Sequence, residues 1–393
     1  MVGMVEKYIK SNMCVLPWTH LEVDVNGSAS PCCLYRGEIA DYKVYRDNLD
    51  TIQNSKYMDD LRDQFRRGER PSGCTNCWQE EDAGKVSKRM NSIYKMKNSL
   101  RDWTPDTKPS LKFIDFKLGN VCNLKCRICG SWSSSKWAQE EIAYGPNPLA
   151  KKQLDEGQWP KRNPAFFEDI KPVLRDVEYF EFTGGEPFMI ENHFRILEHC
   201  VEQGYARNQD IHYNTNGTQL PDLRTFWMLA QFKHIEVAFS IDDTGPAFEY
   251  QRHPARWVEV ERNLNEFRSR SHLTGNTDFQ ICSTISIFNI LNLESLMSWV
   301  KQFNPKFLYI NTLFDPEYFN IQTLPTELKR IVTEKYKNIK ELTSIIGYMN
   351  NQDRYSDVIH EQRKKRIQQA DQYREENFSR IFPELNNFLK IYE

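Results

Sequence analysis

Three closely spaced cysteines are the residues of this sequence best suited to chemistry, in the run Cys122-Asn-Leu-Lys-Cys126-Arg-Ile-Cys129. Ten cysteines in 393 residues are far fewer than a disulfide-bonded scaffold carries, so we expect thiols that bind metal. Thiolates this close on one loop can bind three irons of a cubane cluster, and no fourth cysteine follows nearby. One iron would then keep an open position, as a catalytic zinc does. The alternative is a zinc site whose fourth ligand lies elsewhere, although zinc sites prefer paired C-x2-C units.

This cysteine run resembles the signature of the radical SAM superfamily. In that superfamily three cysteines hold a [4Fe–4S] cluster, and its free iron binds the amino and carboxylate groups of S-adenosylmethionine (SAM). The resemblance therefore implies that Cys122, Cys126 and Cys129 are the cluster ligands. The residue before the last cysteine is usually aromatic in the superfamily. Here it is Ile128, which departs from that form but can still pack against the adenine of SAM.

A second motif follows about sixty residues later, in the stretch Thr183-Gly-Gly-Glu-Pro187. Two glycines let a backbone approach a ligand closely, and a glutamate can accept hydrogen bonds from an ammonium group. The stretch is similar to the GGEP motif of the superfamily. That similarity implies that the SAM amino group is bound by Gly184, Gly185, Glu186 and Pro187. Alone, such a glycine pair would be an ordinary turn.

Further polar residues come at the ends of the next predicted strands. The stretch Asn214-Thr-Asn-Gly217 is similar to a TNG turn of the superfamily, which makes Asn216 a candidate. By the same resemblance Ser240 and Asp242 face the ribose of SAM, because a hydroxyl and a carboxylate suit a diol. Arg252 matches the arginine that often pairs with the SAM carboxylate. Each of these residues could instead be an ordinary polar loop residue.

Asp315 is the catalytic candidate of the sequence, because it follows the last predicted strand and could exchange a proton with substrate. Only its position supports this hypothesis, and an ordinary turn is the favoured alternative because Asp-Pro turns are common. Cys200 and Cys282 are interpreted as small buried apolar residues and not as ligands.

A second set of cysteines precedes the triad. Cys14 and Cys32 flank the alternating residues Leu21, Val23 and Val25 and an Asn-Gly turn, a pattern that predicts a β-hairpin with both cysteines at one end. The spacing C-x12-G-x4-C, followed by a C-x2-C pair, resembles the SPASM/twitch auxiliary-cluster domains of radical SAM enzymes. That resemblance implies a fully ligated [4Fe–4S] cluster on four residues: Cys14, Cys32, Cys74 and Cys77.

Two questions about this set stay open. Cys33 could replace Cys32 as a ligand. A four-thiolate structural zinc site is also compatible with the C-x2-C pair. The order of the domains is unusual as well, because in the enzymes that this segment resembles the auxiliary domain follows the barrel, whereas here it precedes it.

The elements that must position these residues alternate between strands and helices. Apolar segments predict strands at 111–118, 177–182, 211–214, 235–239, 279–287 and 306–311. Amphipathic segments predict helices at 166–175, 192–203 and 257–268. Six such repeats indicate an α/β fold, a partial (β/α)6 TIM-like barrel with its chemistry at the carboxyl ends of the strands.

The sequence divides into four predicted segments. Residues 1–80 form the cysteine-rich twitch-like domain, and residues 81–110 form a helix (85–101) and a linker. Residues 111–323 form the partial barrel, in which 145–164 is expected to be mainly a solvated loop, with a substrate lid as the alternative. Residues 324–393 form a charged helical C-terminal region, whose mixed charges indicate a solvated helical face.

Composition excludes several classes of protein. The net charge of −2 gives no electrostatic basis for binding nucleic acid or a membrane surface. No apolar run approaches the 18 or so residues that a membrane span requires. The first residues lack the apolar core of a secretory signal, so we expect a cytoplasmic protein.

The resemblance implies an enzyme that reductively cleaves SAM to a 5′-deoxyadenosyl radical, which abstracts hydrogen from substrate. The implied cofactors are SAM and two [4Fe–4S] clusters, and the implied partner is a low-potential electron donor such as flavodoxin or ferredoxin. Oxidative modification of a peptide or protein is favoured. The alternatives are oxidation or rearrangement of a sugar or other small molecule, and a non-catalytic iron–sulfur redox or binding protein.

Overall fold

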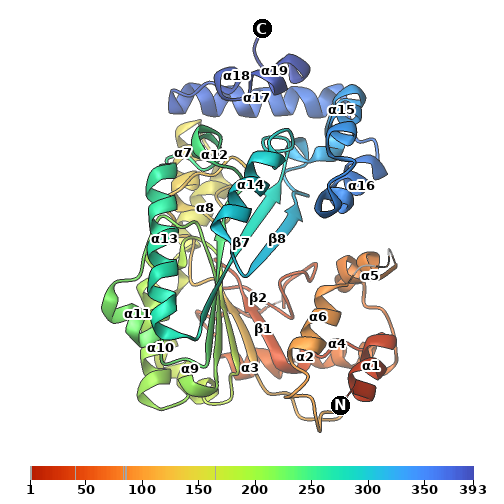
Figure 1. Cartoon of the computed structure of the whole chain (residues 1–393). Helices are drawn as coiled ribbons and strands as arrows, with labels where there is room; N and C mark the ends of the chain where they lie inside the picture. Colours follow the sequence, from red (N-terminus) through yellow and green to blue (C-terminus); the bar gives the residue numbers. More distant parts are fainter. Residues whose placement is uncertain (1, 40, 83, 85, 164) are drawn as a thin grey trace. The chain divides into compact units, whose positions relative to one another are not determined.

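The computed structural model describes residues 2–39, 41–82, 84, 86–163 and 165–393 (Figure 1). The chain forms two compact units. The first unit contains Met1–Cys122, Ser131–Asn214 and Pro221–Glu236, and the second contains Asn123–Gly130, Thr215–Leu220 and Val237–Glu393. The boundary therefore falls within the cysteine triad, with Cys122 in the first unit.

The strands of the described residues form a mixed eight-stranded sheet of order β2-β1-β3-β4-β5-β6-β7-β8. The strands of the first unit are β1 (His20–Val23), β2 (Ala29–Ser30), β3 (Phe113–Phe116), β4 (Tyr179–Phe182) and β5 (Asp210–Thr215). The remaining strands are β6 (His234–Ser240), β7 (Thr277–Ile285) and β8 (Phe307–Thr312). Parallel pairs join β1 to β3, β3 to β4, β4 to β5 and β7 to β8, whereas β1 and β2 are antiparallel. All six strands predicted from the sequence are confirmed, with ends shifted by a few residues.

The predicted N-terminal hairpin is also confirmed. Gly27 has a φ of +77°, a left-handed conformation that glycine adopts without strain, and it lets the chain reverse between β1 and β2. The Asn26 side chain accepts a hydrogen bond from the Ser28 amide (2.9 Å), which stabilises the turn. Strand β1 then pairs in parallel with β3, with Leu21 opposite Ile114. The hairpin thus extends the sheet, a pairing that the sequence analysis did not predict.

Helices connect and flank the strands of the first unit. They are α1 (Val2–Lys10), α2 (Leu16–Thr19), α3 (Leu49–Gln53), α4 (Lys56–Arg66), α5 (Thr75–Asp82), α6 (Lys88–Lys95), α7 (Ser135–Ala143), α8 (Pro148–Glu156), α9 (Phe166–Leu174), α10 (Glu191–Glu202) and α11 (Leu223–Leu229). Several of these helices begin at a capping residue whose side chain accepts a hydrogen bond from a backbone amide of the first turn. Ser55, Ser87 and Asn147 are examples. The aromatic side chains of Trp18 and Trp103 pack edge to face at 5.4 Å beneath these helices.

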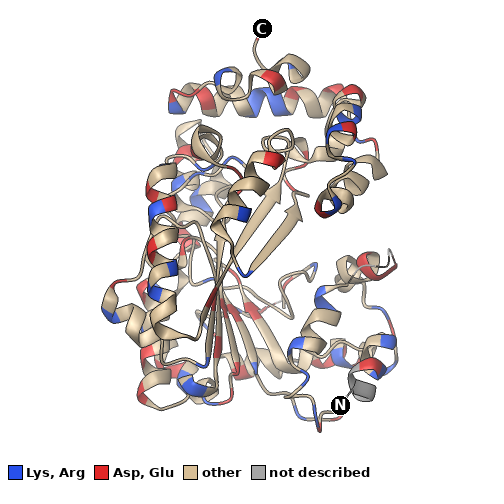
Figure 2. Cartoon of the chain, viewed as in Figure 1, with Lys and Arg blue, Asp and Glu red and all other residues tan. Residues whose placement is uncertain are grey.

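The helices of the second unit are α12 (Gly245–Gln251), α13 (Trp257–Thr274), α14 (Leu293–Phe303), α15 (Thr326–Tyr336), α16 (Thr343–Asn351), α17 (Asp357–Arg374), α18 (Phe378–Ile381) and α19 (Pro383–Leu389). The last five confirm the predicted helical C-terminal region. Helix α17 carries both acidic and basic side chains, with a run of basic residues at 363–366, as expected for a partly solvated helix (Figure 2). In the part of the chain that the structure describes, no helix combines the length and apolar character of a membrane span.

Two of the predicted local structures differ from those observed. The segment 145–164, expected to be mainly loop, contains α8 and a 3₁₀ turn at Trp159–Lys161. Its Asn147 cap and the following Pro148 start the helix, because proline suits the first helical position. The helix predicted at 85–101 is shorter, since α6 spans Lys88–Lys95, and Lys85 lies outside the described residues.

Candidate metal and cofactor sites

The four N-terminal cysteines predicted as ligands line one cavity. Cys14 precedes α2, Cys32 follows β2, Cys74 ends the 3₁₀ turn Ser72–Cys74, and Cys77 lies in the first turn of α5. Apolar side chains complete the lining, among them Leu16, Phe65 and Trp78. The hairpin and α5 thus bring together thiols that are up to 63 residues apart in the sequence. Cys33 is absent from this lining, so the geometry favours Cys32 as the ligand.

The electrostatics of this cavity suit a bound cation. Burial raises the pKa of all four thiols. The proximity of the thiols adds to this, since Cys74 raises the pKa of Cys14, and Cys32 raises the pKa of Cys74. Four thiolates cannot coexist in an apolar cavity without positive charge, and an iron–sulfur cluster or a zinc ion would supply it. Among the described residues, no group of three or more His, Cys, Asp or Glu side chains is close enough together to bind a single metal ion.

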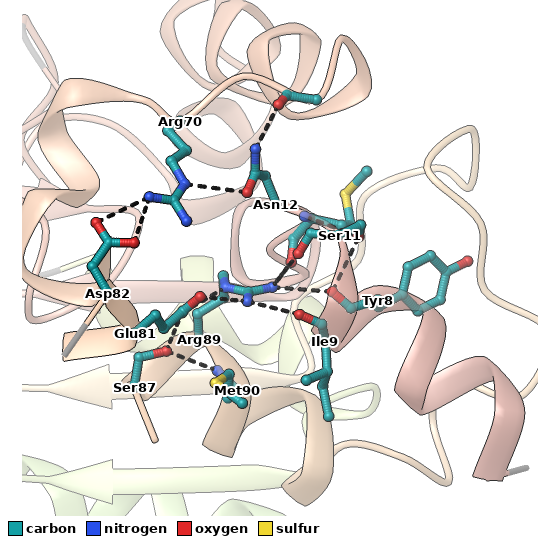
Figure 3. Close-up of polar contacts among 12 residues, drawn as sticks. Tyr8, Ile9, Ser11, Asn12, Arg70, Glu81, Asp82, Ser87, Arg89 and Met90 are labelled. Carbon is teal, nitrogen blue, oxygen red and sulfur yellow. Dashed lines mark hydrogen bonds and ion pairs between the residues drawn. The ribbon is translucent and has the colours of Figure 1, made fainter. Parts of the chain in front are cut away.

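Arg89 ties the cavity wall to the N-terminal segment (Figure 3). Its buried guanidinium donates to the backbone carbonyls of Tyr8, Ser11 and Met13 at 2.7–3.0 Å, and it forms an ion pair with Glu81 at 2.7 Å. Because Met13 directly precedes Cys14, these bonds position the first cysteine of the set. The sequence analysis missed Arg89, since its carbonyl partners lie about eighty residues away.

In the first unit, the Gly184–Gly185 pair packs against the segment that leads to Cys122. Both glycines have positive φ values, +73° and +53°. A Cβ atom on Gly185 would lie 2.4 Å from the Val121 carbonyl oxygen, a contact that no other residue could make. The Glu186 amide donates to that same oxygen at 2.7 Å. The two motifs are therefore joined by backbone contacts beside Cys122.

Glu186 itself is fully buried, and its Oε1 accepts a hydrogen bond from the Phe188 amide (3.2 Å). This bond fixes the short 3₁₀ turn Pro187–Met189 that follows the glycine pair. The buried carboxylate stands at the turn where the sequence predicts the amino group of SAM.

In the second unit, the rest of the cysteine loop is fixed by backbone hydrogen bonds. The Cys129 amide donates to the Cys126 carbonyl at 3.0 Å, which forms a tight turn between the two thiols. Arg252 lies near Cys126, where its charge lowers the pKa of the thiol against the larger, raising effect of burial. The Arg252 guanidinium contacts Asp242 Oδ2 at 2.7 and 3.0 Å. Two predicted SAM-binding residues thus form a buried ion pair beside a predicted iron ligand.

The other predicted site residues are placed as follows. Asn216 donates to the Asn123 side chain (3.1 Å), and Asn123 belongs to the cysteine loop. Ile128 and Ser240 are half-buried. Asp315 is exposed after β8, at a cis peptide bond to Pro316.

Comparison with known families bears on the N-terminal cysteines. Residues 14–78 match the family model named SPASM and described as an iron–sulfur cluster-binding domain. The chain carries a SPASM-type domain. Its match runs from Cys14 to the residue after Cys77, so all four predicted ligands of the cavity lie inside this SPASM-type domain. None of the curated proteins matches the chain.

Several solved structures are similar to this chain at low sequence identity. The protein anSMEcpe, solved with bound AdoMet and the Cp18Cys peptide, is 20% identical over 63% of this chain and 63% of its own, with a TM-score of 0.41. SuiB of Streptococcus suis, solved with S-adenosylmethionine, is 14% identical over 79% of this chain and 64% of its own, with a TM-score of 0.35. TYW1 with a lysine–pyruvate adduct is 10% identical over 58% and 71%, with a TM-score of 0.32. The chain spans just under two thirds of the first of these structures.

A row of polar side chains crosses the sheet next to the SPASM-type domain, in the first unit. Glu22 on β1 lies opposite Asp115 on β3, and Asp115 lies opposite Glu181 on β4. Glu181 lies opposite His212 on β5, whose Nδ1 is 2.7 Å from Glu236 Oε1. We call these five residues the polar row. The sequence analysis missed the polar row. The signal was visible in the sequence, because each of these otherwise largely apolar strands contains a charged or histidine residue in its interior.

The polar row has strong electrostatic coupling. Burial, together with the neighbouring Glu181, raises the pKa of Asp115 to about 8. Lys88 of α6 lies 3.5 Å from Glu181 and holds the pKa of that carboxyl below its usual range against the effect of burial. Lys88, Asp115 and Glu181 are the electrostatic neighbours of Cys33. This cysteine, which is not one of the four predicted ligands, therefore lies close to the polar row.

Proposed function

We propose that this chain is a radical SAM enzyme that oxidatively modifies a peptide or protein. The observation that carries the proposal is the junction of its two motifs. The Gly184–Gly185 turn contacts the Val121 carbonyl directly before Cys122, through an approach that requires glycine. An ordinary turn would explain neither the cysteine spacing nor the two glycines with positive φ values that meet at this contact.

The cysteines present fit a cluster with an open iron. The loop supplies three thiols, Cys122, Cys126 and Cys129, and the turn Cys126–Cys129 aims two of them from one short segment. When bound, such a cluster supplies the electron that cleaves SAM to methionine and a 5′-deoxyadenosyl radical, which removes a hydrogen atom from substrate.

The residues around the loop would bind and orient SAM. Glu186 would accept the SAM ammonium group, since a buried carboxylate at a glycine turn is suited to a cation. Asp242 would accept hydrogen bonds from the ribose hydroxyls of SAM, and Ser240 would also contact the ribose. Arg252, which holds Asp242 at 2.7 Å, would neutralise the SAM carboxylate while keeping Asp242 in place. Ile128 and Asn216 complete the proposed set.

The test is SAM cleavage by protein purified without oxygen and reconstituted with iron and sulfide. With dithionite, the wild-type protein is expected to form 5′-deoxyadenosine, measured by liquid chromatography and mass spectrometry. Cys126→Ala is expected to abolish it, whereas the control Cys200→Ala, a buried cysteine outside both sets, retains it. A wild-type protein that binds a cluster but forms no 5′-deoxyadenosine would favour the non-catalytic alternative.

The SPASM-type domain is proposed to hold a second four-iron cluster, on Cys14, Cys32, Cys74 and Cys77. Metal analysis of the reconstituted protein is expected to give about eight irons per chain and little zinc. About four irons and one zinc would instead make this domain a structural zinc module. In that outcome the cluster could not accept an electron from substrate, and the oxidative chemistry proposed here would be withdrawn.

The substrate class is proposed on the basis of the SPASM-type domain, because the enzymes that it resembles often modify peptides. The experiment compares peptides encoded next to the gene with small sugars, in the presence of a flavodoxin or ferredoxin as the electron donor. A peptide substrate is expected to increase the formation of 5′-deoxyadenosine. The mass of the product peptide is expected to be lower than that of the substrate by the mass of two hydrogen atoms. Stimulation by a sugar alone would support the small-molecule alternative.

Asp315 stays a proposal for proton exchange with that substrate. Its exposure after β8 would let it contact a bound molecule. Full substrate turnover by Asp315→Asn would remove it from the mechanism.

A further inference from the structure

The cysteine loop is held by the C-terminal region of the chain, through Arg127. This arginine stands between two predicted iron ligands, Cys126 and Cys129, and is 4% exposed. Its Nη2 contacts Asp371 Oδ1 at 2.6 Å and also bonds the carboxylate of Glu376. Both carboxylates come from the end of α17 and the residues just after it, about 245 residues further along the chain.

The same guanidinium makes further contacts within the second unit. It lies 3.9 Å from the centre of the Tyr250 ring, and its Nη1 donates to the Ile367 carbonyl at 3.4 Å. A guanidinium that is flat, charged and able to donate in several directions fits this set, whereas a lysine would not.

The carboxylates are themselves fixed by independent contacts. Asp371 accepts hydrogen bonds from the Tyr250 hydroxyl (2.7 Å), the Phe378 amide (2.7 Å) and the Tyr392 hydroxyl (3.0 Å). Glu376 contacts Nδ1 of His253 at 2.7 Å. Residues from α12, α17, α18 and the C-terminal end therefore converge on this pair of carboxylates.

Backbone bonds connect the loop to the same place. The Lys125 amide donates to the His253 carbonyl (2.6 Å), and the Arg127 amide donates to the Gln251 carbonyl (2.7 Å). The segment 251–253 therefore touches the loop through its backbone and touches Glu376 through a side chain. Arg252, the proposed SAM contact, lies in the middle of it.

We propose that Asp371 and Glu376, here called the C-terminal clamp, are positioning residues that hold Cys126, Cys129 and Arg252 in place through Arg127 and His253. This gives the helical C-terminal region a role in the cofactor site, and it rests on the proposed function for what the loop binds. The physical reason is that a buried guanidinium between the buried Asp371 carboxylate and the half-buried Glu376 carboxylate has one low-energy position, because displacing it would leave charges unpaired inside the protein.

The test uses Asp371→Asn and the double variant Asp371→Asn/Glu376→Gln, which keep the side-chain shapes but remove the charges that hold Arg127. Arg127→Lys keeps the positive charge and tests whether the guanidinium geometry matters. The matched control is Arg363→Lys. Arg363 is a fully buried arginine on the same helix, and it donates to the Tyr318 and Thr323 carbonyls and the Thr323 hydroxyl rather than to the loop.

The first measurement is amide hydrogen exchange of the metal-free protein. The double variant is expected to increase exchange in the peptide covering 123–130 at least about tenfold, and Arg363→Lys is expected to change it less. The reason is that opening of the loop breaks the ion pairs of Arg127 in the wild-type protein, whereas the double variant has no such pairs to break. Equal exchange of 123–130 in the double variant and the control would overturn the proposal. This measurement does not depend on whether a cluster binds.

The second measurement follows the reconstituted protein. The clamp variants are expected to lose iron to a chelator about tenfold faster than Arg363→Lys, as variants in the outer residues of metal sites typically do, and to show a weaker SAM-induced change in the electron paramagnetic resonance spectrum of the reduced cluster. Arg127→Lys is expected to fall between these variants and the wild-type protein. If the wild-type protein binds no cluster at the triad, the proposed function fails while the exchange result still decides the clamp. If it cleaves SAM and the clamp variants match the control in both readouts, the clamp alone is wrong.

Discussion

Gly185 shows how closely single atoms define the proposed cofactor site. Its φ of +53° and the 2.4 Å that would separate an added Cβ atom from the Val121 oxygen make glycine the residue that this junction accepts. At the same scale, Asp242 and Arg252 form a buried ion pair at 2.7 Å, in a place where an isolated charge would be costly. The residues that would bind SAM are thus constrained by backbone clearance and by charge pairing.

Gly185→Ala is therefore expected to destabilise the protein by about 2–4 kcal/mol, from the left-handed backbone and the clash with the Val121 carbonyl together. Gly204→Ala is the control, since Gly204 has a φ of +73° but nothing within 4 Å of an added Cβ. Its cost is expected to be about 1 kcal/mol. Urea unfolding of the metal-free proteins measures both values, and equal shifts would show that the close contact is relieved without cost.

Asp115 makes a second prediction at this scale. Its pKa is raised from 3.8 to about 8 by burial and by Glu181, so the folded protein holds a proton that the unfolded chain releases across this range. The carboxyl therefore makes stability fall as the pH rises from about 4 to 8. Asp115→Asn removes this contribution.

We expect Asp115→Asn to gain at least about 1 kcal/mol in free energy of unfolding, relative to wild type, between pH 5 and pH 8. Urea unfolding at several pH values measures this difference, with the exposed Asp155→Asn as the control. A difference between Asp115→Asn and wild type that stays constant across this pH range would mean that Asp115 is ionised throughout.

At the scale of elements, the SPASM-type domain is joined to the sheet rather than standing apart from it. Strand β1 of its hairpin pairs along its whole length with β3, from His20 opposite Phe113 to Val23 opposite Phe116. Helix α6 is bound to the N-terminal segment through Arg89, which donates to four backbone carbonyls ahead of Cys14 (Figure 3). The segment that carries Cys14 is therefore held by backbone pairing of β1 on one side and by a buried arginine on the other.

Arg89→Ala is expected to destabilise the protein by about 3 kcal/mol, because it leaves Glu81 and several buried carbonyls without their partner. Arg70→Ala is the matched control, since the Arg70 pair with Asp82 lies in the same region but is exposed, and its loss is expected to cost less than about 1 kcal/mol (Figure 3). Chemical denaturation measures the stability, and iron per chain measures the occupancy of the cysteines. A smaller effect for Arg89→Ala than for Arg70→Ala would contradict this account.

At the scale of the whole molecule, the two sets of cysteines are distributed differently over the two units. All four predicted ligands of the SPASM-type domain belong to the first unit. The triad is divided, since Cys122 belongs to the first unit, whereas Cys126 and Cys129 belong to the second. Metal bound at the two sets is therefore expected to stabilise different parts of the chain.

Removing metal with a chelator is accordingly expected to expose two different regions. In Cys122→Ala, which retains the SPASM-type site, chelation should increase hydrogen exchange mainly within residues 14–78, since binding energy at a four-ligand site stabilises the fold around it. In Cys74→Ala/Cys77→Ala, chelation should affect mainly residues 121–130. Hydrogen exchange with mass spectrometry distinguishes these outcomes, and an identical pattern in both variants would show that the two sites do not act separately.

Local chemistry made several features predictable from the sequence alone. The Cys122–Cys129 spacing, the Asn26-Gly27 turn and the apolar strand segments each depend on residues that are near neighbours in the chain. For the same reason the six strands, the hairpin and the C-terminal helices were predicted correctly, since periodicity and turn residues express local preferences.

Long-range pairing decided the rest. The convergence of Cys14, Cys32, Cys74 and Cys77 was expected by resemblance, but the apolar cavity and the Arg89 contacts depend on how separate elements pack. The polar row exists because parallel pairing places Glu22, Asp115 and Glu181 in register, and register is a property of the sheet. The carboxylate partners of Arg127 lie about 245 residues away, a separation at which local sequence patterns predict no contact. The sequence by itself determined the local elements and the candidate residues for metal and SAM. The tertiary structure decided what holds those candidates in place, because packing and strand register bring together parts of the chain that local preferences cannot relate.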